Sequence, residues 1–147
     1  MSAQGGLIFF RSPRCSWPCV SSIVLLLLGL LLIYSRLIFE GLVLAGFDTQ
    51  TYFYPYWTYA FDSLRAGHVP LWNPNLFTGV PFLANPQAAV FYLPNWLLLP
   101  ISPERALGFA LVLHVALAAA GTLAFSRVSF KAGWPGATTA GAAFAFG

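Results

Sequence analysis

Two apolar stretches of twenty residues constrain the fold of this chain more than any other feature. Residues 20–39 carry one charge, Arg36, near their end, and residues 106–125 carry none. Twenty helical residues cover about 30 Å, which is the thickness of the hydrocarbon core of a bilayer. Arg36 can extend its side chain to the headgroups. We therefore predict two transmembrane helices in an all-α polytopic membrane protein.

A third apolar run, residues 133–147, continues to the end of the chain. It is too short to span a bilayer, and no polar flank closes it. We expect the chain to be the N-terminal piece of a longer protein, with this run as the start of a third transmembrane helix. The alternative is a complete small protein with a short re-entrant tail. Small residues such as Ala116, Ala120 and Gly136 predict close packing against further helices.

The composition argues against a soluble or nucleic-acid-binding protein. Only 7% of the residues are charged, whereas soluble proteins have about one quarter. Seven basic and four acidic residues are too few and too scattered for a nucleic-acid surface. Cys15 and Cys19 have neither the spacing nor the neighbours of a zinc site or a disulfide framework. We expect them to be reduced cytoplasmic thiols.

The basic residues beside the apolar stretches predict the orientation, because cytoplasmic flanks are enriched in Lys and Arg. Four of them share one side of the predicted membrane and two lie on the other: Arg11, Arg14, Arg127 and Lys131 against Arg36 and Arg105. This bias puts residues 1–19 and 126–132 in the cytoplasm and residues 40–105 outside it.

A cleaved signal peptide is the alternative for the N-terminus, with Val43-Leu44-Ala45 as the cleavage site. The apolar core is longer than a signal peptide requires, and Arg36 and Glu40 lie between it and that site. An uncleaved helix is therefore the interpretation that we favour.

The external segment has an unusual composition for a connection between two helices. Residues 40–104 hold all four acidic residues, eight of the eleven prolines and fourteen of the 25 aromatic residues. Ordered connections of this length usually have structure or function of their own, and flexible linkers lack aromatic residues. Trp and Tyr are favoured at the headgroups. We predict a folded layer that lies against the membrane surface.

One amphipathic helix is predicted within this layer, over residues 55–66. Pro55 suits the first helical position, and Gly67 suits the left-handed residue after the end. Trp57, Phe61 and Leu64 fall on one face, so the helix should lie in the interface plane. Farther along, the apolar piece at 88–100 contains Pro94 and is too short to span, which favours a half-buried or re-entrant helix.

Asp48 is the candidate for chemistry at the exit of the first helix. A carboxylate beside the bilayer and backed by aromatic residues can act as a general base or a metal ligand. The alternative is a capping or turn residue. For Asp62 we expect an ordinary ion pair with Arg65, three residues later. Arg65 and His68 can bind an anionic group such as a phosphate, or simply form a solvated helix end.

His114 falls in the middle of the second apolar stretch. A polar side chain at that depth faces other helices and finds a partner. A structural hydrogen bond, a proton relay and a ligand contact are the three interpretations that the sequence leaves open.

Four short motifs occur in order along the external segment. They are Asp48-Thr-Gln-Thr-Tyr-Phe-Tyr-Pro55, Pro70-Leu-Trp-Asn-Pro74, Gly79-Val-Pro-Phe-Leu-Ala-Asn-Pro-Gln87 and Phe91-Tyr-Leu-Pro-Asn95. With these motifs the chain resembles the YfhO-type bacterial membrane proteins, a branch of the GT-C glycosyltransferase superfamily, over about residues 20–147.

The resemblance implies a GT-C-like helix bundle with a long extracytoplasmic first loop, in which the helix at 55–66 is the interfacial helix. It implies an enzyme of the bacterial plasma membrane that transfers a sugar from a polyprenyl-phosphate donor to a cell-envelope acceptor. By position, Asp48 matches the essential acidic residue of that loop, as catalytic base or as ligand of a divalent cation, Mg or Mn. Side chains that would bind the substrates are Arg65, His68, Trp72, Asn85 and Gln87, and Trp57 and Trp96 are further candidates for stacking.

One departure from the superfamily concerns the acidic residues. Many members have paired acids in this loop, whereas Asp48 has no acidic neighbour in the sequence. A later loop would have to supply the second acid, so metal dependence is an open question. The chain alone, with two complete spans and no closed site, is expected to be inactive.

Two other functions are compatible with the same residues. A transporter or flippase component would use His114 and the Pro94 segment to line a path through the membrane. A noncatalytic membrane assembly protein would tolerate substitution of both Asp48 and His114.

Overall fold

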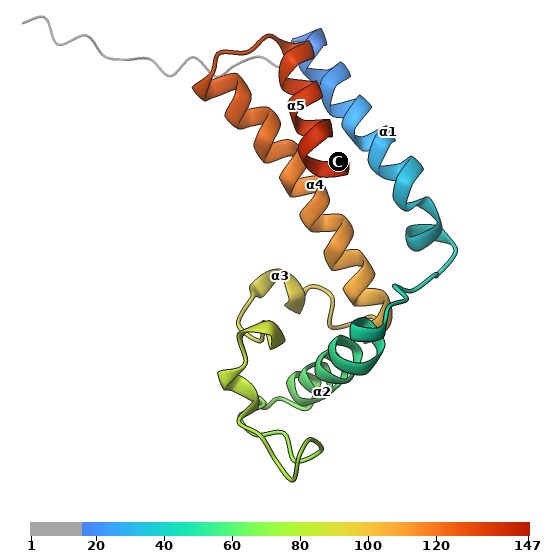
Figure 1. Ribbon diagram of the computed structural model, residues 1–147, viewed down its shortest axis with the longest axis vertical. Helices are drawn as coiled ribbons and strands as arrows, with labels where there is room; N and C mark the ends of the chain where they lie inside the picture. Colours follow the sequence, from blue (N-terminus) through green and yellow to red (C-terminus); the bar gives the residue numbers. More distant parts are fainter. Residues whose placement is uncertain (1–15) are drawn as a thin grey trace, which may run out of the picture.

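The computed structural model describes residues 16–147, and the described part is helical without strands (Figure 1). Its elements, in chain order, are α1 (Trp17–Phe39), a π-helical turn (Thr49–Phe53), α2 (Tyr54–Arg65), 3₁₀ turns at Phe82–Ala84 and Pro86–Ala88, α3 (Leu93–Trp96), α4 (Pro103–Ser129) and α5 (Trp134–Phe146). A single antiparallel bridge joins Asn73 and Val80. The predicted all-α class is confirmed for the described residues.

Helices α1 and α4 are the two described helices that are long and apolar enough to cross a membrane, with 23 and 27 residues. Both begin earlier than the apolar stretches because a proline, Pro18 or Pro103, occupies the first turn, where its missing N–H costs nothing. Large apolar side chains remain exposed along them, including Leu25 at 60% and Leu32 at 79%. A core helix of a soluble protein would bury such residues, so this exposure suits contact with lipid.

The three long helices form one bundle in which α1 and α4 run antiparallel and α5 returns along them (Figure 1). The Thr138 hydroxyl of α5 donates to the Ser22 hydroxyl of α1 at 2.7 Å. Gly141 of α5 lies so close to α4 that an added Cβ would be 2.8 Å from the Ala119 carbonyl oxygen. Helix α1 therefore packs on both α4 and α5.

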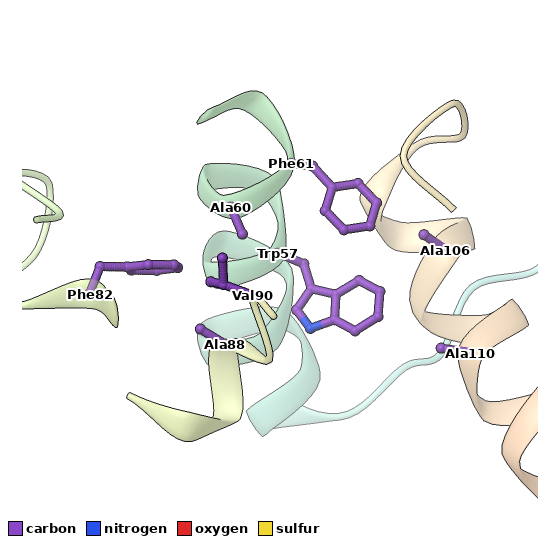
Figure 2. Close-up of a cluster of buried hydrophobic side chains, with 8 residues drawn as sticks. All are labelled: Trp57, Ala60, Phe61, Phe82, Ala88, Val90, Ala106 and Ala110. Carbon is purple, nitrogen blue, oxygen red and sulfur yellow. The ribbon is translucent and has the colours of Figure 1, made fainter. Parts of the chain in front are cut away.

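The residues between α1 and α4 form a separate layer around α2, which lies across the end of the bundle (Figure 1). Trp57 and Phe61 of α2 are buried, and Leu64 packs against the same cluster. Figure 2 shows this cluster, in which the α2 side chains meet Ala106 and Ala110 of α4. The predicted apolar face therefore exists, but it is buried on α4 and the loop instead of facing headgroups.

A hydrogen bond connects Tyr92, at the start of the short helix α3, to His114 of α4. The Tyr92 hydroxyl and His114 Nε2 are 2.8 Å apart, and His114 Nδ1 is 2.6 Å from the Ala110 carbonyl oxygen. A carbonyl only accepts, so Nδ1 donates to it, and in the neutral ring Nε2 accepts from Tyr92. His114 thus has the structural hydrogen bond that the sequence left as one of three interpretations. It lies eleven residues into α4, about 16 Å from its start.

The prediction of a reduced thiol at Cys19 is wrong, because the structure has this cysteine in a disulfide. Cys15, to which the same prediction applied, lies outside the described residues.

Replacing Gly141 by Leu should separate α5 from α4, because even a Cβ atom at this position meets backbone. We expect the free energy of unfolding to fall by about 1–3 kcal/mol. Reversible unfolding of the protein in mixed micelles measures this change. Gly136→Leu on the same helix is the control, since nothing lies within 4 Å of a Cβ there. Equal losses in the two variants would contradict the packing described here.

Candidate functional site

Asp48 occupies the start of the helical segment that leads into α2. Its backbone is helical (φ −64°, ψ −34°), and its side chain caps no backbone N–H. The turn around it is held by other groups: the Gln50 N–H donates to the Gly46 carbonyl at 3.0 Å, and the Thr51 hydroxyl to the Phe47 carbonyl at 2.7 Å. Among the described residues, nothing forms a hydrogen bond or ion pair with the exposed Asp48 carboxylate. The capping interpretation is therefore not supported, and the carboxylate is accessible to a substrate.

A π-helical turn, Thr49–Phe53, separates Asp48 from α2. Such turns are rare and are frequent at functional sites. Within it, the Tyr52 ring stacks on Tyr56 at 4.3 Å between centroids, and Tyr56 stacks on Phe82 at 5.2 Å. Local helix propensity does not predict this turn. The sequence feature that coincides with it is the run of consecutive aromatic residues at positions 52–54.

Asn85 connects the third sequence motif to this turn. Its Nδ2 donates to the Tyr52 hydroxyl, and its Oδ1 accepts from the Gln87 backbone N–H at 2.9 Å. The fold therefore brings Asn85 to a tyrosine that follows Asp48 by four residues. The Gln87 side chain is exposed and has no hydrogen bond within residues 16–147.

Arg65 serves a different part of the loop. Its guanidinium donates to the Leu99 carbonyl at 2.8 and 2.6 Å and to the Ile101 carbonyl at 2.6 Å. The expected pair with Asp62 is present at 3.4 Å. Arg65 follows Asp48 by seventeen residues, which corresponds to about 25 Å of helix. Arg65 and the exposed His68 beyond it therefore do not share one phosphate site with Asp48.

The three tryptophans that were candidates for stacking differ in exposure. Trp57 is 6% exposed and belongs to the loop core. Trp96 is 42% exposed, and its indole N–H donates to the Val90 carbonyl at 2.7 Å. Trp72 is 54% exposed and packs on Gly79, where a Cβ would lie 2.5 Å from its Nε1. Trp72 therefore offers the most open ring of the three.

The charge of Glu104, in the first turn of α4, acts on Tyr54 at the start of α2. Burial and the Glu104 charge raise the pKa of Tyr54, while the hydrogen bond from the Tyr54 hydroxyl to the Leu44 carbonyl, 2.6 Å long, acts in the opposite sense. Glu104 is 56 residues from Asp48 in the sequence, so no local pattern relates the two carboxylates. Within residues 16–147, no three His, Cys, Asp or Glu side chains form a group that could hold a metal ion.

Comparison of the chain with protein-family models, with curated proteins and with solved structures finds no match.

Arg65→Lys should loosen the end of the external segment. The single ammonium nitrogen of a lysine lacks the planar fork with which the Arg65 guanidinium reaches both carbonyl groups. Loss of at least one charge-assisted bond should make the backbone amides of residues 97–101 exchange roughly tenfold faster. Hydrogen–deuterium exchange read by mass spectrometry measures this rate. The control is Arg105→Lys, because the Arg105 guanidinium lies over the Phe109 ring, 5.8 Å from its centroid, and makes no hydrogen bond among the described residues. An unchanged exchange rate in Arg65→Lys would contradict the prediction, because it would show that the three hydrogen bonds do not stabilise residues 97–101.

Proposed function

We propose that this chain is part of an integral membrane glycosyltransferase of the GT-C type. The enzyme would transfer a sugar from a polyprenyl-phosphate donor to a cell-envelope acceptor on the extracytoplasmic face of the bacterial plasma membrane. The observation that carries the proposal is the Asp48 carboxylate, exposed and unpaired among the described residues, at the start of the helix that follows α1.

Two further observations support this assignment. The loop between α1 and α4 is folded on α4 through a buried aromatic cluster, so Asp48 belongs to an ordered layer. Asn85, in one of the motifs that carry the resemblance, is hydrogen-bonded to Tyr52 close to Asp48. Both observations agree with the resemblance, in which the first external loop carries the essential acid.

The proposed reaction needs one proton acceptor from this chain. The acceptor hydroxyl loses its proton to Asp48 as its oxygen forms a bond to the anomeric carbon of the sugar. The bond between that carbon and the phosphate oxygen breaks, and its electron pair leaves with the lipid phosphate. That phosphate is already ionised and requires little help from an acid. Tight positioning of the two substrates supplies much of the rate.

Binding of a divalent cation is the alternative role that we propose for Asp48. Mg²⁺ in enzymes of phosphate chemistry is held by one or two carboxylates together with substrate phosphates. Asp48 would be such a ligand instead of the proton acceptor. The ion would stabilise the charge of the departing phosphate.

A transporter or flippase component is the alternative that one observation favours. The Tyr92–His114 hydrogen bond places polar groups beside the middle of α4, where a translocation path would need them. Movement of a lipid-linked sugar across the membrane without formation of a glycosidic bond would establish this function.

In the complete enzyme of which we propose this chain to be part, Asp48→Asn should abolish catalysis while the protein still folds and inserts. We expect transfer of radiolabelled sugar from a polyprenyl-phosphate donor to fall at least about 100-fold, because an amide cannot accept the proton. The control is Glu40→Gln, since the exposed Glu40 carboxylate pairs with Arg36 at 3.1 Å at the same end of α1. This variant should stay within about twofold of the wild type, because exposed ion pairs contribute little. Full activity in Asp48→Asn would remove Asp48 from the reaction.

A further inference from the structure

A polar groove runs along the side of α2. It holds about 480 Å³ and lies between the helix and the turn that follows it. Its polar lining comes from Gln50, Tyr54, Thr58 and Asp62 on the helical side and Asn73 and Asn75 on the turn, and Pro55, Tyr59 and Leu76 complete the walls. The four helical residues follow one another at intervals of four, so they share one face over about 18 Å.

The wall opposite α2 is a turn that is stabilised by its own hydrogen bonds. Asn73 and Val80 exchange two backbone hydrogen bonds, each 2.9 Å long. The Asn73 Oδ1 accepts from the Asn75 backbone N–H at 2.9 Å, and the Tyr59 hydroxyl of α2 donates to the Trp72 carbonyl at 2.6 Å. The turn is therefore closed on itself and tied to the helix, which keeps the width of the groove fixed.

Asn73 has a hydrogen-bond donor that the fold does not use. The residue is 3% exposed, and within residues 16–147 its Nδ2 donates to no group. Every fully buried side-chain nitrogen of the described residues has a hydrogen-bond partner. Because Asn73 Nδ2 has no partner, it is not fully buried and can be reached from the surface. Because Asn73 lines the groove, its amide group is available there to a ligand.

Other polar groups of the groove are equally available. In the described part of the chain, the side chains of Gln50, Thr58 and Asn75 have no hydrogen bonds. Asp62 meets Arg65 through Oδ1, which leaves Oδ2 as an acceptor. The Tyr54 and Tyr59 rings add aromatic surface. Together they offer amide donors, hydroxyl groups, one carboxylate and ring faces.

This set of groups fits one class of ligand. Polyhydroxylated molecules need alternating donors and acceptors, and their C–H faces pack on aromatic rings. An anion is disfavoured because no Lys or Arg lines the groove, and Arg65 is engaged by the Leu99 and Ile101 carbonyls. The volume lies within the range of small-molecule sites, about 300–1,000 Å³.

We propose that the polar groove binds a neutral glycan and holds the acceptor chain during sugar transfer. The role as acceptor site rests on the proposed function, whereas glycan binding does not. One end of the groove is formed by Gln50, two residues after Asp48. A glycan that lies along α2 would therefore reach the region of the carboxylate with one end.

Binding to the intact protein in lipid nanodiscs tests the proposal. Saturation-transfer NMR would use lactose, maltose, mannobiose and diacetylchitobiose as neutral probes and glucose phosphate as the anionic probe. We expect at least one neutral disaccharide to bind and glucose phosphate to bind more weakly. Thr58→Val and Asn75→Ala, from opposite walls, should each weaken binding several-fold to tenfold through a lost hydrogen bond. Thr139→Val on α5, an exposed threonine outside the groove, should bind like the wild type.

The outcomes separate the groove from the catalytic proposal. Glu40→Gln should bind the disaccharide normally, because Glu40 does not line the groove. Glycan binding that depends on Thr58 and Asn75 supports the groove even where no sugar transfer is found. Unchanged affinity in both groove variants, or binding of glucose phosphate alone, would refute the groove as a site for a neutral glycan. This conclusion would hold even if Asp48 proves essential for sugar transfer.

A second arm identifies the source of the glycan. Nanodiscs that contain a polyprenyl-phosphate sugar should bind the disaccharide as well as empty nanodiscs do if the groove takes a free envelope glycan. Displacement of the disaccharide would assign the groove to the sugar of the lipid carrier. Either result keeps the groove as a glycan site, provided that the two groove variants weaken the interaction.

Discussion

The antiparallel pairing of α1 and α4 is the constraint on which the rest of the structure depends. Each helix satisfies its own backbone hydrogen bonds and presents apolar side chains outward, as a bilayer requires. Leu37 near the end of α1 packs on Gly108 near the start of α4, where a Cβ would be 3.1 Å away. This contact brings both ends of the external segment to the same end of the bundle, so the segment has to fold on that end.

The external segment then compensates for its many prolines with side-chain hydrogen bonds. Proline lacks the N–H that a helix or sheet would use, so regular structure alone cannot fix this segment. Side-chain hydrogen bonds connect three stretches of the segment to α2 or to the π-helical turn before it, through Tyr59, Asn85 and Arg65. The hydrogen bond of Tyr92 connects a further stretch to α4. The aromatic rings fill the space between these ties. Both proposed functional elements, Asp48 and the polar groove, are edges of this one layer.

The sequence predicts the elements whose causes are local. Runs of apolar residues predict α1 and α4, and Pro55 and Gly67 predict α2 to within one residue at either end. The Asp62–Arg65 pair follows from spacing on one helix. What the sequence does not predict depends on distant partners. Local patterns show neither the π-helical turn, nor the three bonds from Arg65 to residues 99 and 101, nor the approach of Glu104 to Tyr54. For the same reason Arg65 and His68 look like partners of Asp48 in a linear reading, although a helix holds them far apart.

The measurement that tests the central claim most directly is the side of the membrane on which α2 and its turn lie. With Cys15 and Cys19 replaced by Ser, single cysteines at the exposed positions Phe77→Cys and Lys131→Cys can be labelled in intact cells with a membrane-impermeant maleimide. The account predicts labelling at position 77 and protection at position 131 until the membrane is opened. Labelling at 131 with protection at 77 would place Asp48 in the cytoplasm and contradict the proposed reaction.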